Sequence, residues 1–406
     1  MRRNRIRYHA NWVVPVTSPP IRDGWVNVEN DLVRACGGPS ASGDASGWLD
    51  VDLGRSAILP GVVNAHTHLE LSSFSGVIPP STSMPAWARR LMQRVGLGDP
   101  NAAETRVHAV REIRRSGTAL VGDVTNTLDS LATFDTGAVD AVVFHELLGF
   151  DVLEDDASEV VRPLARLSAE WLDRRVQVRA AAHAPYSVSA ELFRALTTVP
   201  GPRSVHLAES REEIEFLLNG GGPWQEVLDE RGRWDGAWQP PGVGPVAFLE
   251  SVGWLREDTL AVHGVHLTDA EIDRLVRART TVVTCPRSNQ WTGAGIPPVA
   301  SFYARGLRVA IGTDSLASAP DLNLFAELAE VRRLAPDVPA ARLLESATFV
   351  GAQALGRGST HGAIESGRPA ALIAVALPSD VSDVEEYLVN GVEPRQIKWL
   401  EDLGVE

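Results

Sequence analysis

The stretch that decides the fold of this chain is Pro60-Gly61-Val62-Val63-Asn64-Ala65-His66-Thr67-His68-Leu69-Glu70. His66 and His68 stand two residues apart at the end of an apolar run, which is the pattern of a buried strand. Because side chains alternate along a strand, both imidazoles lie on one face and can point at a single ion. Taken alone, the pair could equally be two core histidines, so the metal interpretation depends on the rest of the chain.

Further candidate metal ligands also stand at the ends of strand-like runs. His206, His263 and Asp314 each follow a run of apolar or small residues. In a (β/α)8 barrel, the residues that carry the chemistry come from the ends of several different strands and meet at one face. The pattern therefore predicts a metal-dependent catalytic site on such a barrel.

Strand and helix patterns alternate from about residue 57 to about residue 356, which is typical of βα units. Eight strand candidates, the number that a closed barrel requires, lie near residues 57–66, 117–124, 139–146, 176–183, 203–208, 259–264, 280–285 and 307–313. Both ends of the chain have strand-and-turn composition, with candidate strands at 10–16, 24–28, 49–53 and 371–375. We predict an α/β fold, with a (β/α)8 TIM-type barrel over residues 58–357 and a small β-sandwich domain formed by residues 1–57 and 358–406.

Charge and cysteine content exclude several classes of protein. Lys and Arg number 38 against 52 Asp and Glu, a net charge of −14, which argues against nucleic-acid polymers and acidic membranes as partners. Cys36 and Cys285 are too few for a disulfide framework or a cysteine-based zinc site. No signal-peptide core is visible, and no run approaches the ~18 apolar residues of a membrane span. We expect a soluble, cytoplasmic protein that acts on a small molecule; its oligomeric state stays open, with a homodimer as one alternative.

Six motifs in order carry a resemblance to a known family. They are Pro-Gly-Val-Val-Asn-Ala-His-Thr-His at 60–68, His-Ala-Pro-Tyr-Ser at 183–187, His-Leu-Ala-Glu at 206–209, His-Gly-Val-His at 263–266, Cys-Pro-Arg-Ser-Asn at 285–289 and Gly-Thr-Asp-Ser at 312–315. Together they resemble the amidohydrolase superfamily, in its cytosine-deaminase-like and chlorohydrolase-like branch. The resemblance covers nearly the whole chain, including the split β domain.

The resemblance implies a metal centre with a defined ligand set. His66, His68, His206 and Asp314 match the family's ligands. Three imidazoles and one carboxylate suit one divalent ion, Zn²⁺ first and Fe²⁺ second, with water in the open position. His263 matches a histidine that, in members with one metal ion, contacts the attacking water or the substrate.

Glu209, three residues after His206, decides the type of reaction that the resemblance implies. A carboxyl group there can take a proton from water, deliver it to a ring nitrogen and help ammonia to leave. Asp314 would accept a further proton from the attacking water. The nearby Glu212, Glu213 and Glu215 are expected to be solvated surface residues.

Some family features are missing from this chain. The single lysine, Lys398, lies near the C-terminal end, which excludes the carboxylated lysine of the binuclear members. Asp314 is followed by Ser315, whereas the adenosine-deaminase branch carries an Asp-Asp pair. We therefore expect a mononuclear site.

Three residues are candidates for substrate binding. His183 resembles a histidine that contacts the heterocycle in deaminases of adenine nucleosides, or it could cap its strand. Glu70 resembles the glutamate of the His-Leu-Glu motif in aminodeoxyfutalosine deaminases of the alternative menaquinone route, where it could accept hydrogen bonds from a sugar. Trp87 could pack against a base or belong to the core. The Trp-, Gly- and Pro-rich segment 220–245 is either a lid or an ordinary surface loop.

These residues together imply an enzyme that hydrolyses the carbon–nitrogen bond of a cyclic amidine and releases ammonia from an adenine nucleoside-like substrate. The specific expectation is 6-amino-6-deoxyfutalosine, followed by S-adenosylhomocysteine or adenosine. The alternative within the fold is a hydrolase of another bond, such as a triazine chlorohydrolase or a cyclic amide hydrolase. A metal-retaining binding protein without turnover is the alternative from another class; the presence of both Glu209 and His263 argues against it.

Overall fold

The computed structural model describes residues 5–40, 47–134, 137–172, 174–234, 236–379 and 381–403. Its largest element is an eight-stranded parallel sheet in the order β13-β12-β11-β10-β9-β8-β7-β6. The strands are β6 (Val62–Thr67), β7 (Thr118–Thr125), β8 (Asp140–Leu147), β9 (Val176–Ala182), β10 (Arg203–Leu207), β11 (Thr259–His263), β12 (Thr281–Thr284) and β13 (Arg308–Ile311). The predicted barrel is confirmed, and each observed strand overlaps its predicted range.

The barrel closes between its first and last strands through the residues that follow β13. Thr313 and Asp314 both donate backbone N–H groups to the carbonyl oxygen of His66, each over 3.1 Å. The Asn64 side chain bridges the same seam, because its amide donates to Thr313 Oγ1 over 2.8 Å. Two of the predicted metal ligands, His66 and Asp314, are therefore fixed by the closure of the barrel.

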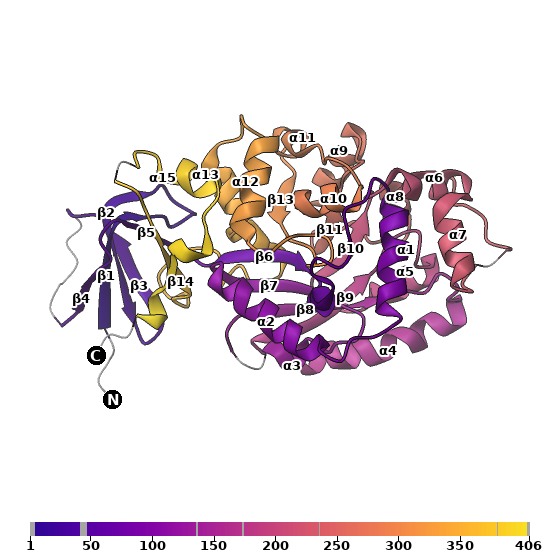
Figure 1. Cartoon of the computed structure of the whole chain (residues 1–406), viewed down its shortest axis with the longest axis horizontal. Coiled ribbons are helices and arrows are strands. Elements are labelled where there is room, and N and C mark those ends of the chain that lie inside the picture. The colour runs from indigo at the N-terminus through magenta and orange to yellow at the C-terminus, as the bar shows by residue number, and fades with distance from the viewer. Residues whose placement is uncertain are drawn as a thin grey trace.

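Both ends of the chain meet in a second sheet, as predicted for the small domain (Figure 1). Its strands are β1 (Arg5–Val13), β2 (Ile21–Glu29), β3 (Leu32–Gly37), β4 (Leu49–Asp52), β5 (Ser56–Pro60), β14 (Leu372–Ala376) and β15 (Ile397–Trp399). In this sheet β14 pairs antiparallel with β5, with Leu372 opposite Pro60. Strands β3 and β15 were not predicted from the sequence.

The strand predicted over residues 57–66 is two strands, β5 and β6, which belong to different sheets. The chain changes sheets at Gly61, where a Cβ atom would lie 2.6 Å from the Ala119 methyl carbon and 2.9 Å from the Trp399 ring. Only glycine lets the two sheets approach this closely at the crossing. The proposed division into residues 1–57, 58–357 and 358–406 stays a prediction, and β5 lies across the first of its boundaries.

Helices follow most of the barrel strands and cover the barrel (Figure 1). They are α1 (Met84–Val95), α2 (Ala102–Arg115), α3 (Leu131–Phe134), α4 (Glu154–Glu170), α5 (Ala190–Leu196), α6 (Arg211–Asn219), α7 (Gly222–Glu230), α8 (Pro245–Ser251), α9 (Asp269–Ala278), α10 (Pro286–Thr292), α11 (Val299–Ala304), α12 (Leu324–Leu334), α13 (Ala340–Ser346), α14 (Phe349–Ala354) and α15 (Val384–Val389). Among the residues described, none of these helices has the length and apolar character needed to cross a bilayer.

Candidate active site

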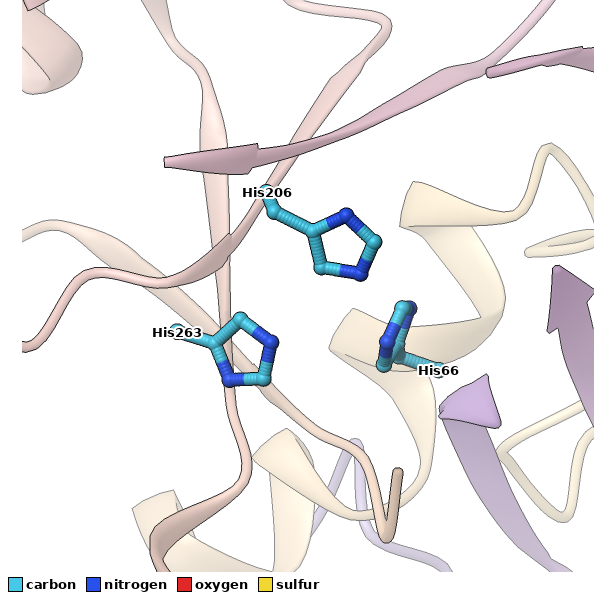
Figure 2. Close-up of side chains that lie close together, drawn as sticks. All are labelled: His66, His206 and His263. Atoms are coloured by element: carbon cyan, nitrogen blue, oxygen red, sulfur yellow. The ribbon is translucent and has the colours of Figure 1, made fainter. Parts of the chain in front are cut away.

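The structure brings the four predicted metal ligands together at the ends of barrel strands. His68 Nε2 lies 3.4 Å from His206 Nε2, and Asp314 Oδ1 lies 3.9 Å from the Nε2 atoms of both His66 and His68. The rings of His66, His206 and His263 point toward one another from three different segments (Figure 2). This buried cluster of imidazoles and a carboxylate can bind a metal ion.

His66 provides the test of whether these residues fit a metal ion. Its side chain is fully buried, and neither ring nitrogen has a hydrogen-bond partner within the described part of the chain. Leaving a buried polar group unpaired costs free energy, and binding a metal ion through one of these nitrogens would remove part of that cost. Burial, with His68 nearby, lowers the pKa of His66 well below its usual value, so the ring is in the neutral form that metal binding requires.

Contacts from neighbouring residues orient the other ligands. The carbonyl oxygen of His183 lies 2.8 Å from His206 Nδ1, which leaves Nε2 of that ring free for a metal. Ser288 and Ser318 donate hydroxyl groups to Asp314 Oδ2 over 2.5 and 3.1 Å. Burial alone would raise the pKa of Asp314, but the adjacent imidazoles, led by His68, outweigh burial and lower it to about 2. The Asp314 side chain is therefore a carboxylate throughout the physiological range.

Three residues of the site have left-handed backbones, which L residues rarely adopt. The φ angles are +49° at Ala208, +74° at His263 and +57° at Asp314. Such strain costs about 1–3 kcal/mol at each position and is typical of functional sites. At His263 it interrupts the alternation of β11, in which Ala261 packs outward with the helices and Val262 packs inside the barrel. The His263 side chain can therefore face the cluster although strict alternation would turn it away.

His263 and Glu209 form a second pair beside the ligands. Asn289 Oδ1 lies 2.8 Å from His263 Nδ1, so Nδ1 is assigned as the donor and Nε2 is left as an acceptor. His263 Nε2 in turn lies 3.7 Å from Glu209 Oε1. Glu209 is only 5% exposed, and burial raises the pKa of its carboxyl group although His263 opposes the shift. A buried carboxyl with a raised pKa is suited to accepting and returning a proton.

One expectation about the neighbouring glutamates is wrong. Glu213 is fully buried, whereas Glu215 on the same helix is exposed. The buried carboxyl group of Glu213 accepts backbone N–H groups from Ala208 and Glu209. Burial raises the pKa of Glu213 to about 8, against the opposing effect of these N–H donors. The sequence suggested a solvated residue because Glu213 lies among other charges in an acidic first turn, where only tertiary structure shows which side chain turns inward.

A cavity of about 770 Å³ opens onto the cluster, and all three predicted substrate-binding residues line it. One ring nitrogen of His183 lies 2.6 Å from Ser187 Oγ, and burial lowers the pKa of this imidazole to about 3, so it is neutral. Trp87 also packs against Ile78 and Ala317, and therefore serves both the cavity wall and the core. Much of the remaining wall is apolar, including Met84, Leu91, Met92, Phe150 and Leu228.

Besides Glu209, the glutamates Glu70 and Glu146 line this cavity, and their carboxyl groups have different hydrogen-bond partners. Glu70 accepts hydrogen bonds from Thr125 Oγ1 over 2.7 Å, from Asn126 N over 3.0 Å and from Thr127 Oγ1 over 3.2 Å, so its carboxylate is already engaged by the loop after β7. Glu146, at the end of β8, accepts from Asn126 Nδ2 at Oε2, whereas its buried Oε1 has no hydrogen-bond partner among the residues described and lies 3.5 Å from His206 Nδ1. Burial raises the pKa of Glu146 to about 7.

Several residues of the site were missed from the sequence. Ser288 and Asn289 lie in the quoted motif at 285–289, which the sequence did indicate. Their roles became clear only from their contacts with Asp314 and His263. Glu146 is an acidic residue at the end of a predicted buried strand, the same signal that identified Asp314. Nothing in the pattern of the sequence distinguished Glu213.

The segment 220–245 contains helix α7 and part of the cavity wall. Trp224 is 2% exposed, stacks on Tyr186 with ring centroids 4.1 Å apart, and donates its indole N–H to Ser210 Oγ over 3.2 Å. The ring of Trp238 stacks on Phe216 with centroids 4.7 Å apart. Tryptophans of this segment therefore pack against residues near the site. Whether the segment is a lid or an ordinary surface loop stays a prediction.

The fold and this cluster define a barrel protein with a buried cluster that can bind a metal ion, and comparisons with known proteins identify its family. Residues 57–398 match the family model described as the amidohydrolase family. The 5-methylthioadenosine/S-adenosylhomocysteine deaminase of Moorella thermoacetica is 30% identical, over 93% of this chain and 91% of the relative. The aminodeoxyfutalosine deaminase of Deinococcus radiodurans is 30% identical, over 82% of this chain and 81% of the relative.

A solved structure supports the same assignment. The adenosine deaminase of Xanthomonas campestris, solved with bound zinc, superposes with a TM-score of 0.81 at 26% identity and covers 97% of this chain and 90% of that one. The chain belongs to the amidohydrolase family, and it is an enzyme of that family.

Proposed function

We propose that this enzyme is a hydrolytic deaminase that releases ammonia from the amino-substituted ring of an adenine nucleoside. The observation that carries the proposal is the position of Glu209, which is buried beside the ligand cluster and 3.7 Å from His263 Nε2. The relatives described above are named as deaminases of such nucleosides, which supports the same reaction.

The residues of this chain divide the work of the reaction. His66, His68, His206 and Asp314 would hold one divalent ion, with zinc as the first choice and iron as the second. When bound, the ion supplies a Lewis acid that lowers the pKa of water toward ~7. Glu209 takes one proton from the attacking water and delivers it to the ring nitrogen next to the amino-bearing carbon. His263 Nε2 accepts a hydrogen bond from the attacking water and so orients it beside the Glu209 carboxyl group.

The reaction ends when the amino group leaves as ammonia, which accounts for both protons of the water. The water oxygen becomes bonded to the ring carbon, the carbon–nitrogen bond to the amino group breaks, and the two water protons end on the ring nitrogen and on the leaving ammonia. Asp314, a carboxylate with a pKa of about 2, is the proposed acceptor of the second proton before the amine takes it. His183, which is neutral and lines the cavity, is the proposed contact to the heterocycle.

The size and lining of the cavity favour a nucleoside with an extended substituent on its sugar. About 770 Å³ of space lies between the cluster and a wall that includes Trp87, Leu91 and Met92. Pockets for small ligands are largely apolar, with a few polar groups that fix orientation. We propose 6-amino-6-deoxyfutalosine as the specific substrate, supported by Glu70 in the His-Leu-Glu motif and by the Deinococcus radiodurans relative. 5-Methylthioadenosine and S-adenosylhomocysteine are the next candidates, supported by the Moorella thermoacetica relative.

The test is ammonia release by the purified, metal-replete enzyme from aminodeoxyfutalosine, methylthioadenosine, S-adenosylhomocysteine, adenosine, cytosine and amino-s-triazines. We expect release from the adenine nucleosides, with the highest kcat/KM for aminodeoxyfutalosine. A preference for another adenine nucleoside would overturn the specific substrate and leave the deaminase. Release only from cytosine or a triazine, or chloride release from a chlorotriazine without ammonia, would overturn the proposed function.

Glu146 is the side chain that we propose to accept a sugar hydroxyl, since its Oε1 accepts no hydrogen bond among the residues described, while Glu70 is engaged by the loop. A hydrogen bond to a charged group contributes about 1.5–3 kcal/mol, so, at a pH well above the Glu146 pKa of about 7, Glu146→Gln should raise KM for a ribonucleoside about tenfold or more. The 2′,3′-dideoxy analogue, which cannot make this bond, should show the same KM with both enzymes. An equal rise in KM for both compounds would contradict the assignment.

A further inference from the structure

Glu213 has a position that the proposed mechanism does not use. It lies in the first turn of α6, with its side chain 0% exposed. Its Oε1 accepts the backbone N–H of Ala208 over 3.0 Å, and its Oε2 accepts the backbone N–H of Glu209 over 2.9 Å. One buried carboxyl group therefore holds two successive backbone N–H groups, the second of which belongs to the proposed proton carrier.

The segment that Glu213 holds is the short connection between β10 and α6. Ala208 has a φ of +49°, which an alanine adopts only when surrounding contacts enforce it. Successive N–H groups around such a residue form a concave site that attracts an acceptor, and Glu213 occupies it. Glu209 follows Ala208 directly, so the direction in which its side chain leaves the backbone depends on this turn.

Other hydrogen bonds of this region hold the Ala208 carbonyl oxygen, which accepts the His266 N–H over 2.9 Å, and the start of α6, whereas the N–H groups of Ala208 and Glu209 are held by Glu213. Ser210 is the N-cap of α6, and its hydroxyl accepts from the Glu213 N–H over 3.2 Å. The Trp224 indole donates to the same hydroxyl over 3.2 Å, which joins the turn to α7. The Ser210 hydroxyl thus accepts a backbone N–H group in the first turn of α6. The N–H groups of Ala208 and Glu209 lie before the helix and are held by the Glu213 carboxyl group.

We propose that Glu213 is a positioning residue, which fixes the left-handed turn at Ala208 and thereby sets the place of the Glu209 carboxyl group relative to His263 and the ligand cluster. This inference rests on the proposed role of Glu209 in proton transfer. Glu213 has no contact with substrate in this arrangement and acts only through the backbone. A purely structural role would instead affect stability without a specific effect on turnover by the folded enzyme.

The variant that tests this is Glu213→Gln, because an amide keeps the size of the carboxyl group but its NH2 cannot accept a hydrogen bond. One of the two N–H groups then faces a donor. We expect faster hydrogen exchange in a peptide that covers residues 207–210, unchanged metal content, and a kcat reduced about tenfold or more with KM changed less than about twofold. Glu215→Gln, the same change on the exposed face of α6, is the matched control and should change none of these quantities.

A double variant separates positioning from a general structural effect. If Glu213 acts only through Glu209, then adding Glu213→Gln to Glu209→Gln lowers kcat no further, because effects that pass through one group are not additive. An unchanged kcat in the folded, metal-replete Glu213→Gln variant, or an additive loss in the double variant, would overturn the inference. If the wild type releases ammonia from no compound, the proposed function fails by itself; unchanged exchange at residues 207–210 would then overturn the positioning role.

Discussion

Glu209→Gln is expected to bind its full complement of metal and to lose turnover by about three orders of magnitude. Proton transfer by a positioned side chain contributes about 10²–10⁴-fold to a rate, and the amide can neither take nor return a proton. The four proposed ligands are other residues, and the amide has almost the volume of the carboxyl group it replaces. Metal content and turnover should therefore separate in this variant.

The measurement is kcat on the best substrate of the panel together with metal content per chain. Glu212→Gln, three residues further along the same segment, is the control, and it should keep both metal and activity because Glu212 is half-exposed and outside the cluster. A Glu209→Gln enzyme with ordinary turnover would remove Glu209 from the reaction. A variant that lost its metal as well would show that this carboxyl group supports the ligand set instead.

His206→Ala and Asp314→Ala are expected to lose both metal and activity. Each substitution removes a proposed ligand: His206 lies in a group with His66 and His263, and Asp314 lies in a group with His66 and His68. Within each group the donor atoms lie within 4.8 Å of one another. Removing Asp314 also removes the negative charge beside His66 and His68, whose Nε2 atoms lie 3.9 Å from Asp314 Oδ1. Activity should fall to the level of the enzyme treated with a chelator, and added zinc should restore the wild type but neither variant.

Metal analysis after dialysis and an activity assay check this prediction. His108→Ala is the control, since this imidazole lies on α2 with 67% of its side chain exposed. It pairs with Glu112 and not with a proposed ligand. Retention of a full equivalent of metal by His206→Ala would show that other residues, such as His263 with His66, carry the ion. Activity that survives chelation in the wild type would contradict a metal-dependent reaction.

The barrel was predictable because its strands are continuous apolar runs that end in chemically distinctive residues. That His66, His68, His206 and Asp314 lie close together could be predicted because each stands at such an end, and parallel strands bring these ends to one face. The junction at Gly61 was not predictable by the same reasoning. Strands β5 and β6 are both apolar, and only the packing of Trp399 and Ala119 against the glycine shows that the chain changes sheets there.

The finer geometry of the site depends on contacts that a linear pattern does not contain. The left-handed backbone at His263 turns its side chain against the alternation of β11. Glu213 looked like one of several surface glutamates, although it is buried beneath the turn at Ala208. The hydrogen bonds that Glu70 accepts from the loop after β7 likewise depend on tertiary structure. The contact of Glu70 with a sugar stays a prediction.

The pairing of β5 with β14 also governs the order in which the molecule can be completed on the ribosome. Ala57, Ile58 and Leu59 are fully buried, and on one side they are covered by a strand that begins only at Leu372. Until that strand is synthesised, β5 presents an apolar edge with unpaired backbone groups, although every strand of the barrel has already been made. Chains that terminate within the last barrel helices therefore carry all the proposed catalytic residues and, at the same time, an open sheet edge that can pair with another chain.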